Sequence, residues 1–119
     1  MAQYDPLTTL ANLALLRDRL IHALAMAKRK KQEVGIVLLG LDRFHEIKTQ
    51  LGPEGGDAVL AATAERLKRC MREVDTVARL GGDLFTCLPE GVSSKGDMEI
   101  VARRIRASTN SPSRSGILS

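Results

Sequence analysis

The sequence predicts an α/β layer fold, an α+β sandwich in which helices flank a central sheet. Residues 34–39 form a nearly continuous apolar run, as in a buried central strand. Apolar residues recur at helical spacing before and after this run. A Gly-Gly-Asp turn joins two short apolar segments into a β-hairpin at 76–88. Helices that alternate with strands favour a sheet covered on at least one face.

The first predicted helix begins after Asn12, a residue type that caps helices, and ends near Lys31. Its apolar stripe consists of Leu13, Leu16, Leu20 and Leu24. A short helix over 43–51 follows the central strand, and Gly52-Pro53 should stop it.

A longer helix begins at Glu54 and carries one apolar face, made of Leu60, Ala64, Leu67, Met71 and Val74. After the hairpin and a loop over 89–96, a last helix over 97–107 turns Met98, Val101 and Ile105 inward. We expect the core to include Leu38, Leu60, Leu67, Met71, Phe85 and Val101.

The chain of 119 residues suits one domain, expected over 1–107. The segment 108–119 is rich in serine, which predicts a flexible tail or a cloning remnant.

Composition excludes several classes of function. Aromatic residues make up only 3% of the chain, so stacking on nucleic-acid bases is not expected. The two cysteines, Cys70 and Cys87, lack metal-ligand spacing and lie in apolar stretches, which favours buried thiols. The apolar runs are shorter than the roughly 18 residues of a membrane span, so we expect a cytoplasmic domain without membrane insertion.

Five segments in fixed order carry a specific resemblance. They are DPLTTLAN (5–12), LDRFHEI (41–47), GPEGGD (52–57), REVD (72–75) and RLGGDLF (79–85). Together they resemble GGDEF diguanylate cyclase domains, with GGDLF in place of the signature. The resemblance implies the palm-like fold of class III nucleotide cyclases. It also implies synthesis of cyclic di-GMP from two GTP molecules, with Mg²⁺ held by carboxylates at the end of the central strand and on the hairpin.

The catalytic positions depart from the family. Gly40 stands where the family has the carboxylate at the strand end, and Leu84 replaces the second signature acid. Asp83 and Asp42 remain as vestigial acids, and Asp83 is the one possible metal ligand. We therefore expect no intact catalytic set and no cofactor, with Mg²⁺ bound only if residual GTP binding persists.

The GTP-binding positions are partly retained. Leu41, Asp57, Gly81 and Gly82 match the family, whereas Lys48 replaces the asparagine that reads guanine. An ammonium has donors only and cannot reproduce the paired donor and acceptor of an amide. The chain also looks shortened at its C-terminal end, where Ser115 to Leu118 either resembles a family strand or is a cloning remnant.

Arg72 and Asp75 match the RxxD motif of the family's inhibitory site for cyclic di-GMP. At a helix end the two residues form either a surface ion pair or a ligand site, with Arg72 on a phosphate or a guanine edge and Asp75 accepting from guanine. In the second case, Arg72→Ala and Asp75→Ala should each weaken binding about tenfold or more, with thermal stability nearly unchanged.

Three functions remain open. The first is a non-catalytic regulatory module that binds cyclic di-GMP or GTP, or that forms a homodimer or contacts a neighbouring domain such as a phosphodiesterase. The second is an active diguanylate cyclase that tolerates Gly40 and Leu84. The third is a ligand-free dimerisation unit. The carboxylates missing at positions 40 and 84 favour the first over the second.

Overall fold

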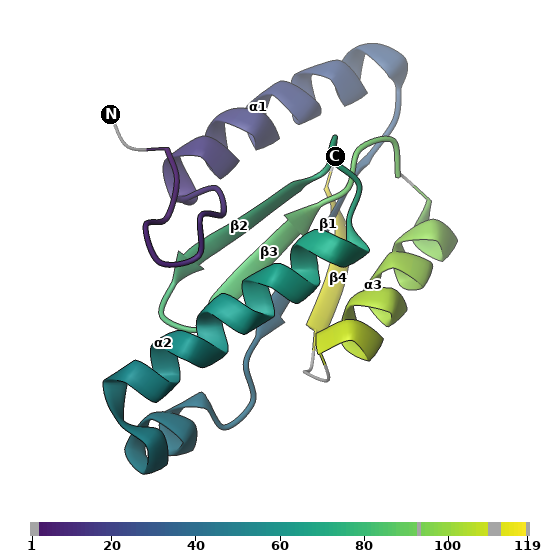
Figure 1. Ribbon diagram of the computed structural model, residues 1–119. Helices are drawn as coiled ribbons and strands as arrows, with labels where there is room; N and C mark the ends of the chain where they lie inside the picture. Colours follow the sequence, from purple (N-terminus) through teal and green to yellow (C-terminus); the bar gives the residue numbers. More distant parts are fainter. Residues whose placement is uncertain (1–2, 93, 110–112, 119) are drawn as a thin grey trace.

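A four-stranded antiparallel sheet with strand order β2-β3-β1-β4 forms the centre of the domain (Figure 1). The computed structural model describes residues 3–92, 94–109 and 113–118. Three helices pack around the sheet, which confirms the predicted architecture. The elements are α1 (Leu13–Lys30), β1 (Val34–Gly40), α2 (Phe44–Cys70), β2 (Thr76–Gly81), β3 (Leu84–Leu88), α3 (Lys95–Thr109) and β4 (Ser113–Leu118).

Helix α1 begins and ends as predicted. The Asn12 side chain accepts a hydrogen bond from the Leu15 amide at 3.0 Å, which satisfies one of the free donors of the first turn. Lys31 ends the helix in the left-handed conformation, with φ of 55°. None of the helices within the described ranges is both long and apolar enough to cross a membrane.

Helix α2 consists of two pieces that meet at Gly52, as the Gly52-Pro53 pair predicts. Gly52 has φ of 76° and ψ of 177°, a conformation that interrupts the helix and favours glycine. The second piece ends at Cys70, because Met71 is already extended. The prediction that Val74 belongs to the inward face is therefore wrong, and its side chain is 60% exposed.

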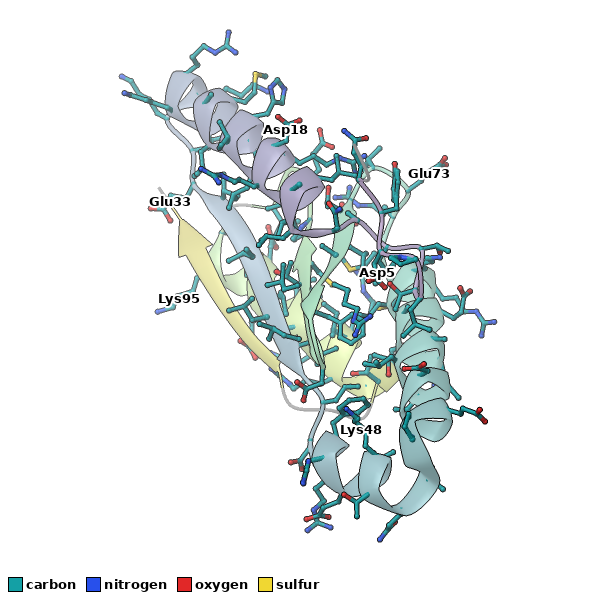
Figure 2. The ribbon with its side chains drawn as sticks, turned by 90° about the vertical axis from the view of Figure 1, so that its left-hand side faces the viewer. Asp5, Asp18, Glu33, Lys48, Glu73 and Lys95 are labelled. Carbon is teal, nitrogen blue, oxygen red and sulfur yellow. The ribbon has the colours of Figure 1, made fainter. Side chains whose placement is uncertain are left out.

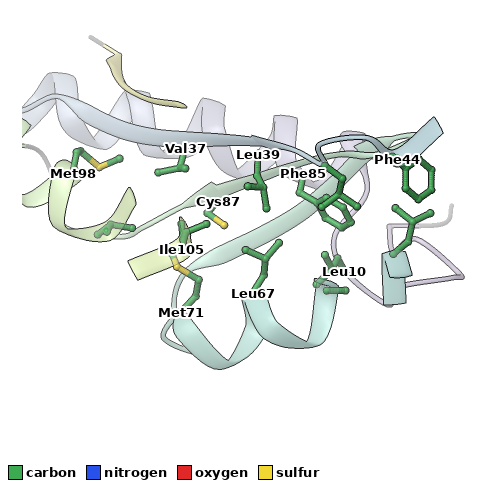
Figure 3. Close-up of a cluster of buried hydrophobic side chains, with 14 residues drawn as sticks. Leu10, Val37, Leu39, Phe44, Leu67, Met71, Phe85, Cys87, Met98 and Ile105 are labelled. Atoms are coloured by element: carbon green, nitrogen blue, oxygen red, sulfur yellow. The ribbon is translucent and has the colours of Figure 1, made fainter. Parts of the chain in front are cut away.

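The main core lies between the sheet and the pair α2 and α3 (Figure 3). Strands β1 and β3 contribute Val37, Leu39, Phe85 and Cys87, and the helices cover them with residues that include Leu60, Leu67, Met71, Met98, Val101 and Ile105. A second cluster, under α1, contains Ala11, Leu15, Leu16, Ala27, Val34, Ala78 and Leu88. Both faces of the sheet thus have helical cover.

Five of the six expected core residues are buried, and Leu38 is the exception. Successive side chains of a strand point to opposite faces, so Leu38 lies on the face opposite to Val37 and Leu39. Helix α1 does not cover that part of the face, and Leu38 is 41% exposed. The continuous apolar run therefore predicted more burial than this strand has.

The structure of the C-terminal segment differs from the predicted flexible tail and from the predicted domain boundary at residue 107. Helix α3 continues to Thr109, and residues 113–118 form β4, which pairs with β1 from Val34–Leu118 to Leu39–Ser113. Backbone groups of β1 supply this pairing, so an edge strand needs little apolar patterning. Residues 110–112 and 119 of the expected tail lie outside the described residues.

Candidate functional site

The Gly-Gly turn of the β2–β3 hairpin is tied to the N-terminal loop. Gly81 and Gly82 have φ of 139° and 52°, which favour glycine. The Arg79 guanidinium donates to the Gly82 carbonyl oxygen from Nε at 3.1 Å and from Nη2 at 2.9 Å. Its Nη1 also donates to both carboxylate oxygens of Asp5 at 3.3 Å. One arginine thus fixes the turn to a segment 74 residues away.

Asp5 is held as a carboxylate in this contact. It accepts from the Thr8 amide at 2.9 Å and the Thr8 hydroxyl at 2.8 Å. Burial by itself raises the pKa of Asp5, but the hydrogen bonds from Thr8 and the bond and charge of Arg79 outweigh it and lower the pKa. Sequence reasoning assigned no role to Asp5 or Arg79, because no local pattern indicates that they meet.

Gly40 and Leu84 lie directly opposite each other across the β1–β3 pair. The Leu41 amide donates to the Asp83 carbonyl oxygen at 3.3 Å just beyond them, so the strand end and the turn meet. A Cβ atom on Gly40 would have no atom within 4 Å apart from those of Gly40 and its two chain neighbours, and Leu84 is 38% exposed. The two positions at which the family has carboxylates are thus adjacent, open and without a charge.

The donors around this point do not fit a Mg²⁺ ion. Mg²⁺ requires near-octahedral oxygen ligands, usually with one or two carboxylates. Gly40 and Leu84 have no ligand atom in their side chains, Asp83 is half-buried, and Asp42 is exposed in the segment after β1. Within the described ranges, no three His, Cys, Asp or Glu residues form a group suited to a metal.

Lys48 and Asp57 lie on the two pieces of α2, and both are exposed. Figure 2 shows Lys48 at the end of the sheet where β1 leads into α2. The Lys48 ammonium lies 5.9 Å from the centre of the Phe44 ring, a cation–π contact. A Cβ atom on Gly56 would come within 2.8 Å of Lys48 Cγ, so the lysine stem lies against Gly56. A role of Lys48 or Asp57 toward guanine stays a prediction.

Arg72 and Asp75 lie in the turn between α2 and β2, not on a helix as expected. Asp75 Oδ2 accepts from the Arg72 amide at 2.8 Å and from Arg72 Nε at 3.4 Å. Asp75 Oδ1 accepts from Arg72 Nη2 at 3.0 Å and from the Glu90 amide at 2.8 Å. Arg72 Nη2 also donates to the Glu90 carbonyl oxygen. The pair therefore joins the turn to the loop after β3.

The two side chains of this pair differ in exposure, at 58% for Arg72 and 1% for Asp75. Both residues line a cavity of about 420 Å³ that Arg19 and Lys68 also line. This volume lies within the range of about 300–1,000 Å³ that is usual for small-molecule sites. Binding of cyclic di-GMP there stays a prediction, and the ion-pair interpretation accounts for the geometry without a ligand.

The two thiols differ in their surroundings. Cys87 is buried as predicted, and burial, reinforced by the neighbouring Cys70 and Asp75, raises its pKa to about 12. Cys70 is only partly buried, and burial again raises its pKa. Neither thiol has the lowered pKa of a nucleophilic cysteine.

Comparisons with known proteins agree with the fold and with the hairpin. The family profile "Diguanylate cyclase, GGDEF domain" matches residues 2–117. The diguanylate cyclase TpbB of Pseudomonas aeruginosa is 40% identical over 113 residues, which are 95% of this chain and 26% of TpbB. The solved GGDEF domain of TpbB aligns with a TM-score of 0.86 and 36% identity, over 96% of this chain and 73% of that structure.

Two further relatives come from the same organism. The bifunctional diguanylate cyclase/cyclic di-GMP phosphodiesterase MucR is 40% identical over 90 residues, 76% of this chain and 13% of MucR. The diguanylate cyclase SiaD, solved in complex with its activator SiaC, aligns with a TM-score of 0.86 and 28% identity, over 98% of this chain and 49% of SiaD. The chain thus spans about a quarter of TpbB and less of MucR.

The profile match covers nearly the whole chain, and the solved relatives share the predicted palm-like sheet and its hairpin. By sequence and by structure, this chain belongs to the GGDEF domain family of cyclic-di-GMP signalling proteins.

Proposed function

We propose that this domain is a non-catalytic regulatory module of cyclic-di-GMP signalling. One observation carries the proposal: Gly40 and Leu84 face each other where the family's chemistry needs carboxylates. In-line attack of a ribose hydroxyl on an α-phosphate requires a metal that activates the hydroxyl and neutralises the triphosphate. A hydrogen atom and an isobutyl group supply neither a ligand nor a compensating charge.

The test is a cyclase assay on the purified domain with GTP and Mg²⁺. We expect no cyclic di-GMP by chromatography, even at concentrations that favour dimers. Turnover by the wild-type domain that Asp83→Ala abolishes would establish the alternative, an active diguanylate cyclase, and would overturn the proposal.

The structure also offers a matched pair of variants for the same assay. Position 40 has free space for a side chain and position 84 is partly exposed, so Gly40→Asp with Leu84→Glu should fold normally. The double variant Gly40→Asn with Leu84→Gln has nearly the same shape but no charge. Binding of Mn²⁺ or Mg²⁺ that appears only in the acidic variant would support the view that lost carboxylates explain the inactivity. Metal binding by the wild-type domain equal to that of the acidic variant would contradict it.

A second part of the proposal is that cyclic di-GMP binds at Arg72 and Asp75. An exposed guanidinium lies beside a carboxylate, and both line a cavity of about 420 Å³ that Arg19, Lys68 and Glu73 also line. A guanidinium paired with a carboxylate is chemistry that suits a phosphate and a guanine. MucR, to which this chain is similar, carries a phosphodiesterase activity in its name, and SiaD was solved with an activator protein. We infer that this domain likewise acts on a partner, either a second copy or a neighbouring domain such as a phosphodiesterase.

Calorimetric titration with cyclic di-GMP separates the receptor from a ligand-free dimerisation unit. If the domain is a receptor, the titration should release heat, and Arg72→Ala should weaken the affinity about tenfold or more, because a charge-assisted contact is worth about 1.5–3 kcal/mol. The exposed neighbour Arg69, changed to Ala, is the control for a general loss of positive charge. If the wild-type domain gives no heat at high micromolar ligand but sediments as a dimer, the ligand-free dimerisation unit replaces the receptor.

A further inference from the structure

The Asp75 carboxylate has no free acceptor position in this structure. A carboxylate offers about four lone-pair positions to donors. Asp75 receives the Arg72 amide, Arg72 Nε, Arg72 Nη2 and the Glu90 amide. A guanine that presents its N1 and N2 donors to Asp75 therefore needs two of these donors to leave.

The four donors are not equally free to leave. The amides of Arg72 and Glu90 are backbone groups whose positions the turn and the β3 end fix, and their bonds to Asp75 are the shortest, at 2.8 Å each. The Arg72 guanidinium is at the end of a flexible side chain that is 58% exposed, and its bonds are longer, at 3.4 and 3.0 Å. Removal of the guanidinium frees one position on each oxygen, which is the pattern that two adjacent guanine donors require.

We propose that Arg72 masks Asp75 in the ligand-free domain, and that cyclic di-GMP binds by displacing the Arg72 guanidinium from the carboxylate. This inference rests on the proposed receptor function and adds how its site opens. Guanine N1–H and N2–H take the two released positions on Asp75, and the displaced guanidinium turns to a phosphate of the ligand. The two backbone amides keep their bonds, so Asp75 stays in place throughout.

Displacement of Arg72 should also affect the loop that lines a second cavity. Arg72 Nη2 donates to the Glu90 carbonyl oxygen, so release of Arg72 also removes a restraint on the loop after β3. Pro89, Glu90, Gly91 and Val92 in this loop form one side of a cavity of about 490 Å³ whose other side is α1. Arg19 of α1 lines both cavities and donates to the Thr76 hydroxyl at 3.2 Å. Ligand binding at Asp75 should therefore shift the loop after β3 and change the shape of this 490 Å³ cavity, here called the α1 groove.

The test combines calorimetry with nuclear magnetic resonance of the whole domain, labelled with ¹⁵N. In the free protein, the Arg72 Nε–H resonance should be protected from solvent exchange by its bond to Asp75. Cyclic di-GMP should shift this resonance and the amides of Gly91 and Val92, while the Glu90 amide stays protected. Cyclic di-AMP is the matched ligand control, because adenine lacks the N1 and N2 donors, and it should bind at least tenfold more weakly.

Each outcome bears on the proposal. Heat with cyclic di-GMP while the Arg72 Nε–H resonance is unchanged would leave the receptor intact and overturn the mask. Displacement of Arg72 without shifts in Gly91 and Val92 would overturn the link to the α1 groove. Equal affinity for cyclic di-GMP and cyclic di-AMP would exclude Asp75 as the guanine acceptor. Absence of heat with either ligand would instead reject the receptor function itself.

Discussion

Replacement of Asp75 by alanine should destabilise the domain strongly, although the sequence favoured a variant of nearly unchanged stability. The side chain is 1% exposed and receives two backbone amides, those of Arg72 and Glu90, at 2.8 Å. Alanine leaves both amides without an acceptor, at about 1–3 kcal/mol for each buried group. Water can reach the turn beside the exposed Arg72, and its hydrogen bonds to the two amides should offset part of this free-energy cost. We therefore expect a loss of about 2–4 kcal/mol, against the 5–15 kcal/mol of a typical domain.

Urea unfolding of the wild-type domain and of two variants measures this difference. Glu73→Ala is the control, because Glu73 lies in the same turn but is exposed, and it should change the free energy of unfolding by less than about 0.5 kcal/mol. An Asp75→Ala variant as stable as Glu73→Ala would refute the reasoning from the hydrogen bonds. The expected loss also means that Arg72→Ala, at an exposed side chain, tests ligand binding more cleanly than Asp75→Ala does.

Three further predictions concern the core, the N-terminal contact and the thiols. Leu67→Ala should lower the free energy of unfolding by about 2–5 kcal/mol, whereas Leu38→Ala should cost less than about 1 kcal/mol in the same urea titration, because Leu67 is fully buried and Leu38 is 41% exposed. The pKa of Asp5 is lower in the folded state than its ordinary value of 3.8, so the carboxylate stabilises the fold above that pH and the contribution disappears as the pH falls through the folded pKa. Asp5→Asn should accordingly be less stable than wild type near pH 6, and a difference between the two urea midpoints that does not shrink as the pH falls below 3.8 would contradict this. A maleimide should modify Cys70 before Cys87 in the folded protein, since the Cys87 thiol is buried with a pKa of about 12, and mass spectrometry that finds the two equally reactive would disprove it.

The sequence was informative where local chemistry decides the conformation. Asn12 caps α1, Gly52 interrupts α2, and Gly81 with Gly82 forms the hairpin turn, each through its own side chain or backbone freedom. The amphipathic faces of α2 and α3 likewise identified most of the core. These features depend on residues within a few positions of each other, which a single sequence displays directly.

The sequence was uninformative where contacts between residues far apart in the chain determine the conformation. Residues 113–118 form a strand because the free edge of β1 pairs with them, and their serine-rich composition does not reveal that edge. Leu38 is exposed because the cluster under α1 includes Val34 of β1 but not Leu38, although the apolar run indicated uniform burial. The Arg79–Asp5 contact joins two residues 74 positions apart, and the Asp75–Glu90 contact depends on how the hairpin returns to the end of α2. The sequence thus offered the Arg72–Asp75 ion pair as one alternative, but it did not predict the bonds of this pair to Glu90.

The shape of the signature turn depends on residues other than those at positions 40 and 84, so the turn forms without carboxylates at these two positions. The turn needs the positive φ of Gly81 and Gly82 and the two bonds from Arg79 to the Gly82 carbonyl oxygen. Neither position 40 nor position 84 contributes to these interactions. Glycine inside a strand even costs about 0.5–1 kcal/mol relative to alanine, and no neighbour of Gly40 requires the absence of a side chain. Packing therefore gives no reason for Gly40, and a domain with Gly40 and Leu84 still forms the hairpin, the sheet and the Arg72–Asp75 turn on which the proposed regulatory function depends.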